Sequence, residues 1–260
     1  MPLAPLKLCT TDNLQLAAIL ETPDGKAPFP LVVQAHGYNS QKNSQTNLAV
    51  TAGLIAKGIA TLRFDFRGHG ESQGNIEDVN ITTGLRDLAA VIDWADNSAE
   101  IDQDQIGLMG SSYGGVVVTL QAAKHPNRIK CLALKAPATD WGEARTLQID
   151  HHSIAEWQRR GYHQLEGTEP PITVPYSFYE DITSYDTYAA AERITCPVLI
   201  IHGDADRSVP VEQSRKLAKK LGGETELQVI PGVDHRFSKE ADFRLMISQS
   251  TSFLATHLGT

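Results

Sequence analysis

Cysteine is scarce in this chain, which has three in 260 residues, at Cys9, Cys131 and Cys196. An odd number of distant cysteines provides neither a disulfide framework nor the close spacing of a metal site. Each one lies in an apolar stretch typical of a strand, so we expect buried, unreactive thiols in a reducing compartment. The adjacent His151 and His152 project in diverging directions and have no further ligands at useful spacing. We therefore expect no metal and no cofactor.

Long basic runs and long apolar runs are also missing. The longest basic runs are pairs such as Lys219-Lys220, and a net charge of -8 argues against a nucleic acid partner. The apolar runs are too short to cross a bilayer, and residues 1–5 lack the features of a signal peptide. We expect a cytoplasmic globular protein with no membrane span. The sequence leaves the oligomeric state open, with a homodimer as one candidate.

The chain does contain a serine between glycines, in the segment Gly110-Ser111-Ser112-Tyr113-Gly114. An apolar run typical of a buried strand ends at this segment, and an apolar helical stretch follows it. Small residues allow a tight turn from strand to helix that lifts the central side chain out of the sheet. Ser112 is thus a candidate nucleophile. Because glycine-rich strand ends are common, the rest of the chain must supply a base, an acid and oxyanion donors.

Strands and helices alternate on both sides of this turn. Residues 6–21 have the period of an antiparallel strand pair, and amphipathic helical stretches separate the strands that follow. Residues 30–37 form a continuous apolar run typical of a strand covered on both faces, and further strands are predicted at 59–66, 104–111, 129–136 and 196–203. This pattern predicts an α/β fold with a mostly parallel, doubly wound sheet.

The alternation fails between Pro137 and about Arg193, where prolines, tyrosines and tryptophans gather and only residues 153–160 have a helical pattern. We interpret this segment as an insertion between two halves of one sheet. The predicted division is a core of residues 1–137 and 193–260, with a lid of residues 138–192 after the sixth strand.

The candidate acid and base follow other strands. In a parallel sheet, ligands bind beyond the carboxyl ends of the strands. Asp206 follows the strand at 196–203, with Asp204 as a competitor that suits a turn cap better, and His235 follows a strand at 226–230. A serine hydroxyl needs a base to take its proton, and the base needs a carboxylate to fix its tautomer. We therefore predict a triad of Ser112, Asp206 and His235.

An oxyanion hole requires two backbone N–H donors, as a rule. One is predicted to be the N–H of Tyr113, directly after the nucleophile, and the other the N–H of Tyr38, after the strand that ends at His36-Gly37. The other histidines are assigned no role in catalysis. Among them, His69 and His125 are expected on the surface or in turns.

These pieces together resemble the α/β-hydrolase superfamily over nearly the whole chain. The matching segments are 36–37, 65–72, 110–114, 202–210 and 234–235. The resemblance implies Ser112 as nucleophile, Asp206 as acid, His235 as base, and Tyr38 and Tyr113 as oxyanion donors. It also implies an α/β-hydrolase fold, in which the loop at 67–72 is structural.

Within that superfamily the chain is similar to lidded bacterial cinnamoyl (feruloyl) esterases and to monoacylglycerol lipases. Residues 104–115 also resemble the corresponding turn of prolyl-oligopeptidase-type peptidases. Those peptidases carry a large extra domain that a chain of this length does not hold, which weakens the peptidase alternative.

Aromatic residues of the lid are the candidates for an acyl or aryl pocket, although packing of the lid onto the core would equally explain most of them. They are Trp141, Trp157, Tyr162, Tyr176, Phe178 and Tyr179. Tyrosines in place of long aliphatic residues favour a serine carboxylesterase for small or aryl esters, hydroxycinnamoyl esters included.

Other functions stay open to different degrees. The same triad would serve a peptidase or amidase acting on small peptides or amides, or a monoacylglycerol lipase. A binding protein without turnover is disfavoured because no triad member is missing. Haloalkane or epoxide chemistry is disfavoured because the families that perform it place an aspartate at the position of Ser112.

Overall fold

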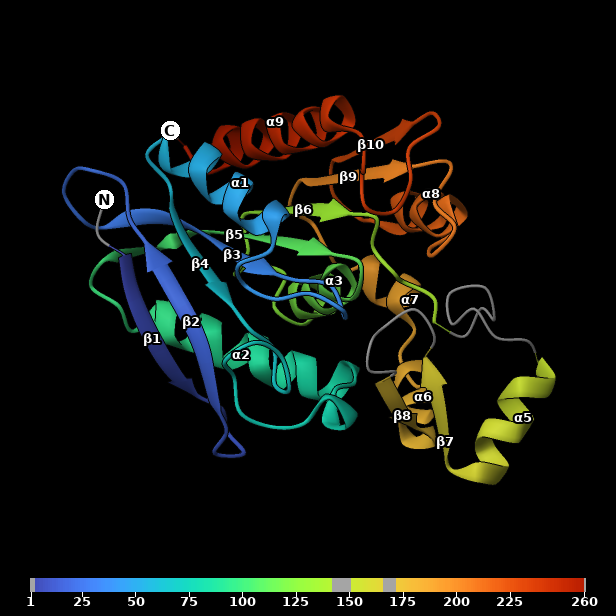
Figure 1. Ribbon diagram of the computed structural model, residues 1–260. Coiled ribbons are helices and arrows are strands. Elements are labelled where there is room, and N and C mark those ends of the chain that lie inside the picture. Colours follow the sequence, from blue (N-terminus) through green and yellow to red (C-terminus); the bar gives the residue numbers. More distant parts are fainter. Residues whose placement is uncertain (1–2, 142–150, 166–171, 260) are drawn as a thin grey trace.

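The computed structural model describes residues 3–141, 151–165 and 172–259 (Figure 1). One sheet has the strand order β1-β2-β4-β3-β5-β6-β9-β10. Its strands are β1 (Leu3–Cys9), β2 (Gln15–Glu21), β3 (Phe29–Ala35), β4 (Ala60–Phe64), β5 (Ile101–Ser111), β6 (Cys131–Lys135), β9 (Val198–Gly203) and β10 (Thr225–Ile230). The pairs β1·β2 and β2·β4 are antiparallel, and the strands from β4 to β10 pair in parallel. The predicted α/β fold with a mostly parallel sheet is confirmed.

Helices cover both faces of this sheet because its strand residues alternate between two apolar cores. In β6, Leu132 and Leu134 belong to one core, and Cys131 and Ala133 belong to the other. Residues of α2 (Ile81–Asp96), α3 (Tyr113–Lys124) and α8 (Val211–Lys220) close the first core, and residues of α1 (Gln45–Ile55) and α9 (Glu240–His257) close the second. In Figure 1, α1 and α9 accordingly lie on the opposite side of the sheet from α2 and α3.

The segment between β6 and β9 adds elements beyond the carboxyl ends of the central strands (Figure 1). Its described elements are α5 (His151–Arg160), β7 (Tyr162–Leu165), β8 (Ile172–Pro175), α6 (Tyr176–Thr183) and α7 (Thr187–Ala191). The expected helix near 153–160 is present, whereas the antiparallel pair of β7 and β8 is not evident from the sequence. Asp181 ties this segment to the core, because its carboxylate accepts the N–H groups of Ile81 and Thr82 at the start of α2.

One expectation about a single side chain was wrong, and another needs detail. Cys9 is exposed, because neighbouring residues of an edge strand face opposite sides and Leu8 is the one that faces the core, while Cys131 and Cys196 are buried as expected. His69 lies in a turn, one of the two places expected for it, but it is buried because the loop that carries it folds back onto the strand ends. Its ring nitrogens contact the carbonyl oxygens of Arg67 and Tyr38.

The loop at 67–72 is anchored by Arg67, which is buried and pairs with two carboxylates. Its Nη2 lies 2.7 Å from Oδ1 of the fully buried Asp87, and its Nη1 lies 2.8 Å from Oδ2 of the partly exposed Asp12. A buried ion that loses its partner is left uncompensated at low dielectric, whereas an exposed pair contributes little.

Asp87→Asn should therefore lower the free energy of unfolding by about 3–5 kcal/mol, and Asp12→Asn by about 1 kcal/mol or less. Urea denaturation measures both losses. The two variants are comparable because each replaces a carboxylate partner of Arg67 by the same amide. Equal losses for the two variants would show that burial does not set the strength of these pairs.

Candidate active site

Ser112 lies at a sharp turn between β5 and α3. Its backbone has φ 51° and ψ -113°, a strained conformation for a residue with a side chain. Two glycines permit the turn: a Cβ at Gly110 would lie 2.5 Å from the carbonyl oxygen of Gly114, and one at Gly114 would lie 2.2 Å from that of Ala35. The backbone of Ser112 is held on both sides, since its N–H donates to the Lys135 carbonyl (2.9 Å) and its own carbonyl accepts from Ala138 (3.1 Å).

Asp206 and His235 come together from loops after two neighbouring strands. His235 Nδ1 lies 2.6 Å from Asp206 Oδ2, and the Asp206 carboxylate is fully buried while the His235 side chain is 22% exposed. The other oxygen, Oδ1, accepts the N–H groups of Ser208 and Val209 at 2.8 Å each. Burial raises the pKa of the Asp206 carboxyl, but hydrogen bonds from His202 and His235 outweigh it and hold that pKa well below its usual range. Asp206 is therefore an ionised acceptor.

His202, the first residue of the segment 202–210, also contacts Asp206, and no role was predicted for it. Its side chain is fully buried, and its Nε2 lies 3.0 Å from both Asp206 Oδ2 and the Val209 carbonyl, which only accept. We therefore place the proton on Nε2, so that Nδ1 accepts from the Ser214 hydroxyl at 2.7 Å. The spacing His202-x-x-x-Asp206 is the sequence signal for this contact, because the end of β9 and the loop after it bring the two side chains together.

The loop with Tyr38 runs directly beside Ser112, since a Cβ built on Gly37 would lie 3.5 Å from Ser112 Cβ. Among the described residues, no acceptor is recorded for the backbone N–H of Tyr38 or for that of Tyr113. His36 fixes the loop: its Nε2 accepts from Phe66 N–H (3.1 Å) and its Nδ1 donates to the Gly37 carbonyl (2.8 Å). Burial, together with the neighbouring His69, lowers the pKa of His36, which keeps its ring neutral.

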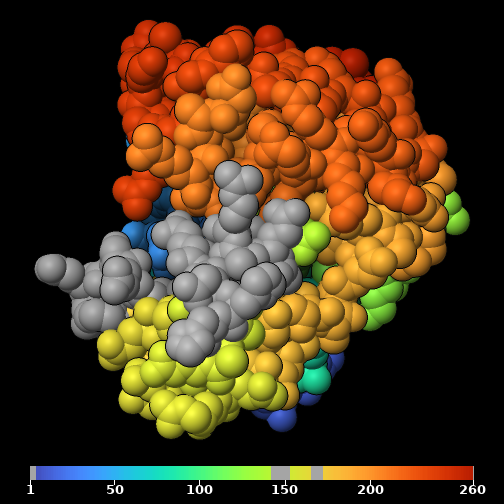
Figure 2. All heavy atoms as spheres, turned by 90° about the vertical axis from the view of Figure 1, so that its right-hand side faces the viewer, coloured from blue at the N-terminus to red at the C-terminus, as the bar shows by residue number. Residues whose placement is uncertain are grey.

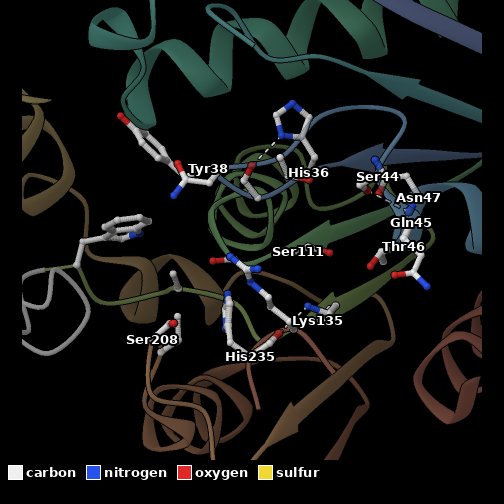
Figure 3. A pocket seen from close by; sticks show the side chains of 18 of the residues that line it. His36, Tyr38, Ser44, Gln45, Thr46, Asn47, Ser111, Lys135, Ser208 and His235 are labelled. Atoms are coloured by element: carbon white, nitrogen blue, oxygen red, sulfur yellow. Dashed lines mark hydrogen bonds between the residues drawn. The ribbon is translucent and has the colours of Figure 1, made fainter. Parts of the chain in front are cut away.

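A pocket of about 870 Å³ opens at this edge of the sheet, and both Ser112 and His235 line it. Figure 3 shows Tyr38 and His36 on one side of the pocket, His235 and Ser208 on another, and the start of α1 on a third. Figure 2 looks at the same end of the molecule, with atoms of the inserted segment in yellow and light orange below the orange C-terminal region. Residues 142–150 and 166–171 of the predicted lid lie outside the described residues.

The structure separates the lid aromatics that were predicted as substrate contacts. Trp141 lines the pocket together with Phe178. The described lining does not include the other four: Trp157 is buried with its Nε1 donating to the Val174 carbonyl (3.0 Å), Tyr162 is half exposed, and Tyr176 and Tyr179 stack on each other. For Trp157, Tyr176 and Tyr179, these contacts favour packing within the segment between β6 and β9, whereas Tyr162 is exposed. In the described ranges, no cluster of three potential metal ligands occurs.

One charged residue of the pocket lining was not anticipated. Lys135 ends β6 and is 7% exposed, and its Nζ donates to the backbone carbonyl of His235 at 2.8 Å. Burial lowers the pKa of Lys135 to about 8 although Asp206 and Asp234 act against that shift. The only sequence signal for it is a lysine that interrupts the apolar run Cys131–Leu134 at the carboxyl end of a strand.

Comparison with known proteins shows that the chain is similar to peptidases, an esterase and a thioesterase. The model of the prolyl oligopeptidase family matches residues 44–260. Est1E from Butyrivibrio proteoclasticus, solved with bound ferulic acid, is 26% identical with a TM-score of 0.81, and the match covers 98% of this chain and 100% of that one. The rat mitochondrial palmitoyl-protein thioesterase ABHD10 is 26% identical, over 85% of this chain and 74% of its own length. The uncharacterized peptidase YuxL of Bacillus subtilis is 26% identical over 94% of this chain but only 37% of its own length.

In the described part of the chain, no helix is long and apolar enough to span a membrane.

Proposed function

Because the chain belongs to the prolyl oligopeptidase family, within the α/β-hydrolase serine hydrolases, we propose that it hydrolyses carboxylic esters through an acyl-enzyme on Ser112. The observation that carries the proposal is the shared pocket: a strained, backbone-anchored Ser112 faces the same space as His235, which a buried, ionised Asp206 holds in place.

In the proposed reaction, His235 Nε2 takes the hydroxyl proton of Ser112 while Oγ attacks the carbonyl carbon of the ester. Asp206 accepts a hydrogen bond from the Nδ1–H group of His235, fixes the tautomer of that ring and stabilises the imidazolium that forms. The negative charge on the carbonyl oxygen is stabilised by the N–H groups of Tyr38 and Tyr113. His235 then gives the proton to the leaving alcohol, and a water molecule activated by the same histidine releases the acid.

We further propose small or aryl acyl groups as substrates, hydroxycinnamoyl groups included. Three rings that line the pocket contact one another, with centroids 5.6 Å apart for Tyr38 and Phe178 and 5.7 Å for Trp141 and Phe178. Aromatic walls favour a flat acyl group through edge-to-face contacts. Among the described lining residues, only Ala138 and Val209 are aliphatic, which disfavours a long fatty chain and hence a lipase. The likeness to Est1E with bound ferulic acid supports the same substrate class.

A peptidase or amidase is the second candidate, because the family model is that of prolyl oligopeptidase. A comparison of the p-nitrophenyl ester and the p-nitroanilide of one acid separates the two functions. We expect turnover of the ester and none of the anilide, and methyl ferulate should be hydrolysed at least about tenfold faster than methyl butyrate. Anilide turnover that equals ester turnover would establish the amidase, and equal rates for the two methyl esters would remove the aryl preference.

A further inference from the structure

The pocket is cationic although the protein is acidic. The chain has 31 acidic and 23 basic residues, yet none of the described residues that line the pocket is an aspartate or a glutamate. Lys135 and Arg236 both line it. The pocket therefore concentrates positive charge at a site where a neutral ester needs none.

Neither of these cations has a carboxylate partner within ion-pair distance in the described part of the chain. Lys135 uses one donor for the His235 carbonyl and lies 5.1 Å from the ring centroid of Phe237, which leaves further N–H groups for a ligand. The nearby carboxylates have other donors: Asp206 accepts from His202 and His235, and Asp234 accepts from Ser238. Arg236 repels the charge on Lys135, which a bound anion would relieve.

The position of this pair relative to His235 indicates which part of the substrate it would meet. Lys135 is hydrogen-bonded to the backbone of His235, and Arg236 is the next residue in the chain. In Figure 3, Lys135 lies beside His235, between it and the start of α1, while Tyr38 lies on the other side of the pocket. Because His235 delivers a proton to the leaving group, the leaving group must lie on the His235 side of Ser112.

We propose that the natural leaving group carries a carboxylate, which Lys135 and Arg236 bind while the acyl group lies against Tyr38, Trp141 and Phe178. This inference rests on the proposed ester hydrolysis and adds the substrate class on its alcohol side. Charge-assisted hydrogen bonds to a carboxylate, one of them from a buried lysine, give the selectivity.

The test compares 4-acetoxybenzoate with its methyl ester, which form the same acetyl-enzyme and differ only in the charge of the leaving group. Wild-type kcat/KM should be at least about tenfold higher for the carboxylate, and rising salt should reduce that ratio. The methyl ester has the better phenolate leaving group, so intrinsic reactivity cannot produce this preference. Lys135→Met and Arg236→Gln should each lower the ratio, and the double variant should bring it to about one or below.

The ratio, and not the rate, is the readout, because loss of the Lys135 bond to His235 would slow both substrates alike. Arg244→Gln is the matched charge control, because Arg244 is 78% exposed and outside the pocket lining. The ratio of the two kcat/KM values in this variant should equal that of the wild type. A wild-type ratio near one would overturn the inference while ester hydrolysis stands, and no turnover of either ester would reject the proposed function itself. A carboxylate preference confined to a second pair, mono-p-nitrophenyl glutarate against p-nitrophenyl hexanoate, would place the anion in the acyl group and overturn the assignment to the leaving group.

Discussion

Ser112→Ala should abolish ester hydrolysis, lowering kcat for p-nitrophenyl butyrate by at least about 10⁴-fold. Without Oγ no acyl-enzyme forms, so only stabilisation of the oxyanion and general-base attack by water are left. The sharp turn between β5 and α3 should persist in this variant, because its geometry comes from Gly110, Gly114 and the backbone hydrogen bonds of residue 112 rather than from the hydroxyl.

Ser111→Ala is the matched control, since the same hydroxyl is deleted one residue earlier, at the end of β5 and also in the pocket lining. This variant should stay within about tenfold of the wild type, because a side chain that only borders the substrate contributes at most one hydrogen bond. Thermal unfolding of both variants checks that they fold. Full activity in Ser112→Ala, or loss only in Ser111→Ala, would show that Ser112 is not the nucleophile.

Asp206→Asn should lower kcat by about 10⁴-fold while the protein stays folded. The asparagine can keep its oxygen toward the N–H groups of Ser208 and Val209, but its NH₂ then faces His235 Nδ1. An NH₂ group donates where the carboxylate accepts, so His235 takes the wrong tautomer and its Nε2 can no longer act as the base.

Asp204→Asn makes the same chemical change two residues away. Asp204 is exposed and accepts the N–H of Gly232, so it braces the loop that leads to His235 without touching the histidine. The activity of the Asp204→Asn variant should stay within a few-fold of the wild type, as for other surface changes. The reverse pattern, with the large loss in Asp204→Asn, would identify Asp204 as the acid.

The sequence predicts the strands and the positions of the site residues well because both depend on local patterns. Apolar runs that stop at glycine or at a polar residue mark strand ends, and parallel strand ends meet at one edge of the sheet. Ser112, Asp206 and His235 each follow such a run, and their catalytic roles stay predictions.

The burial of single side chains and their place in the pocket depend on packing that no local sequence pattern encodes. Trp141 and Trp157 are equivalent in the sequence, yet Trp141 lines the pocket while Trp157 is buried beneath β8 through its bond to Val174. The burial of His69 follows from a loop folded back onto the strand ends. The contact of Lys135 with the His235 carbonyl depends on β6 lying beside β9, which no local pattern shows.

Covalent labelling of the nucleophile tests the proposed role of Ser112 most directly. The folded protein is treated with diisopropyl fluorophosphate, digested, and mapped by mass spectrometry. We expect esterase activity to fall in proportion to the labelling of Ser112, with Ser111 unmodified and no labelling of Ser112→Ala or of protein unfolded before treatment. Folded, ester-hydrolysing protein that carries no label on Ser112, or carries it on another residue, would show that Ser112 is not the nucleophile.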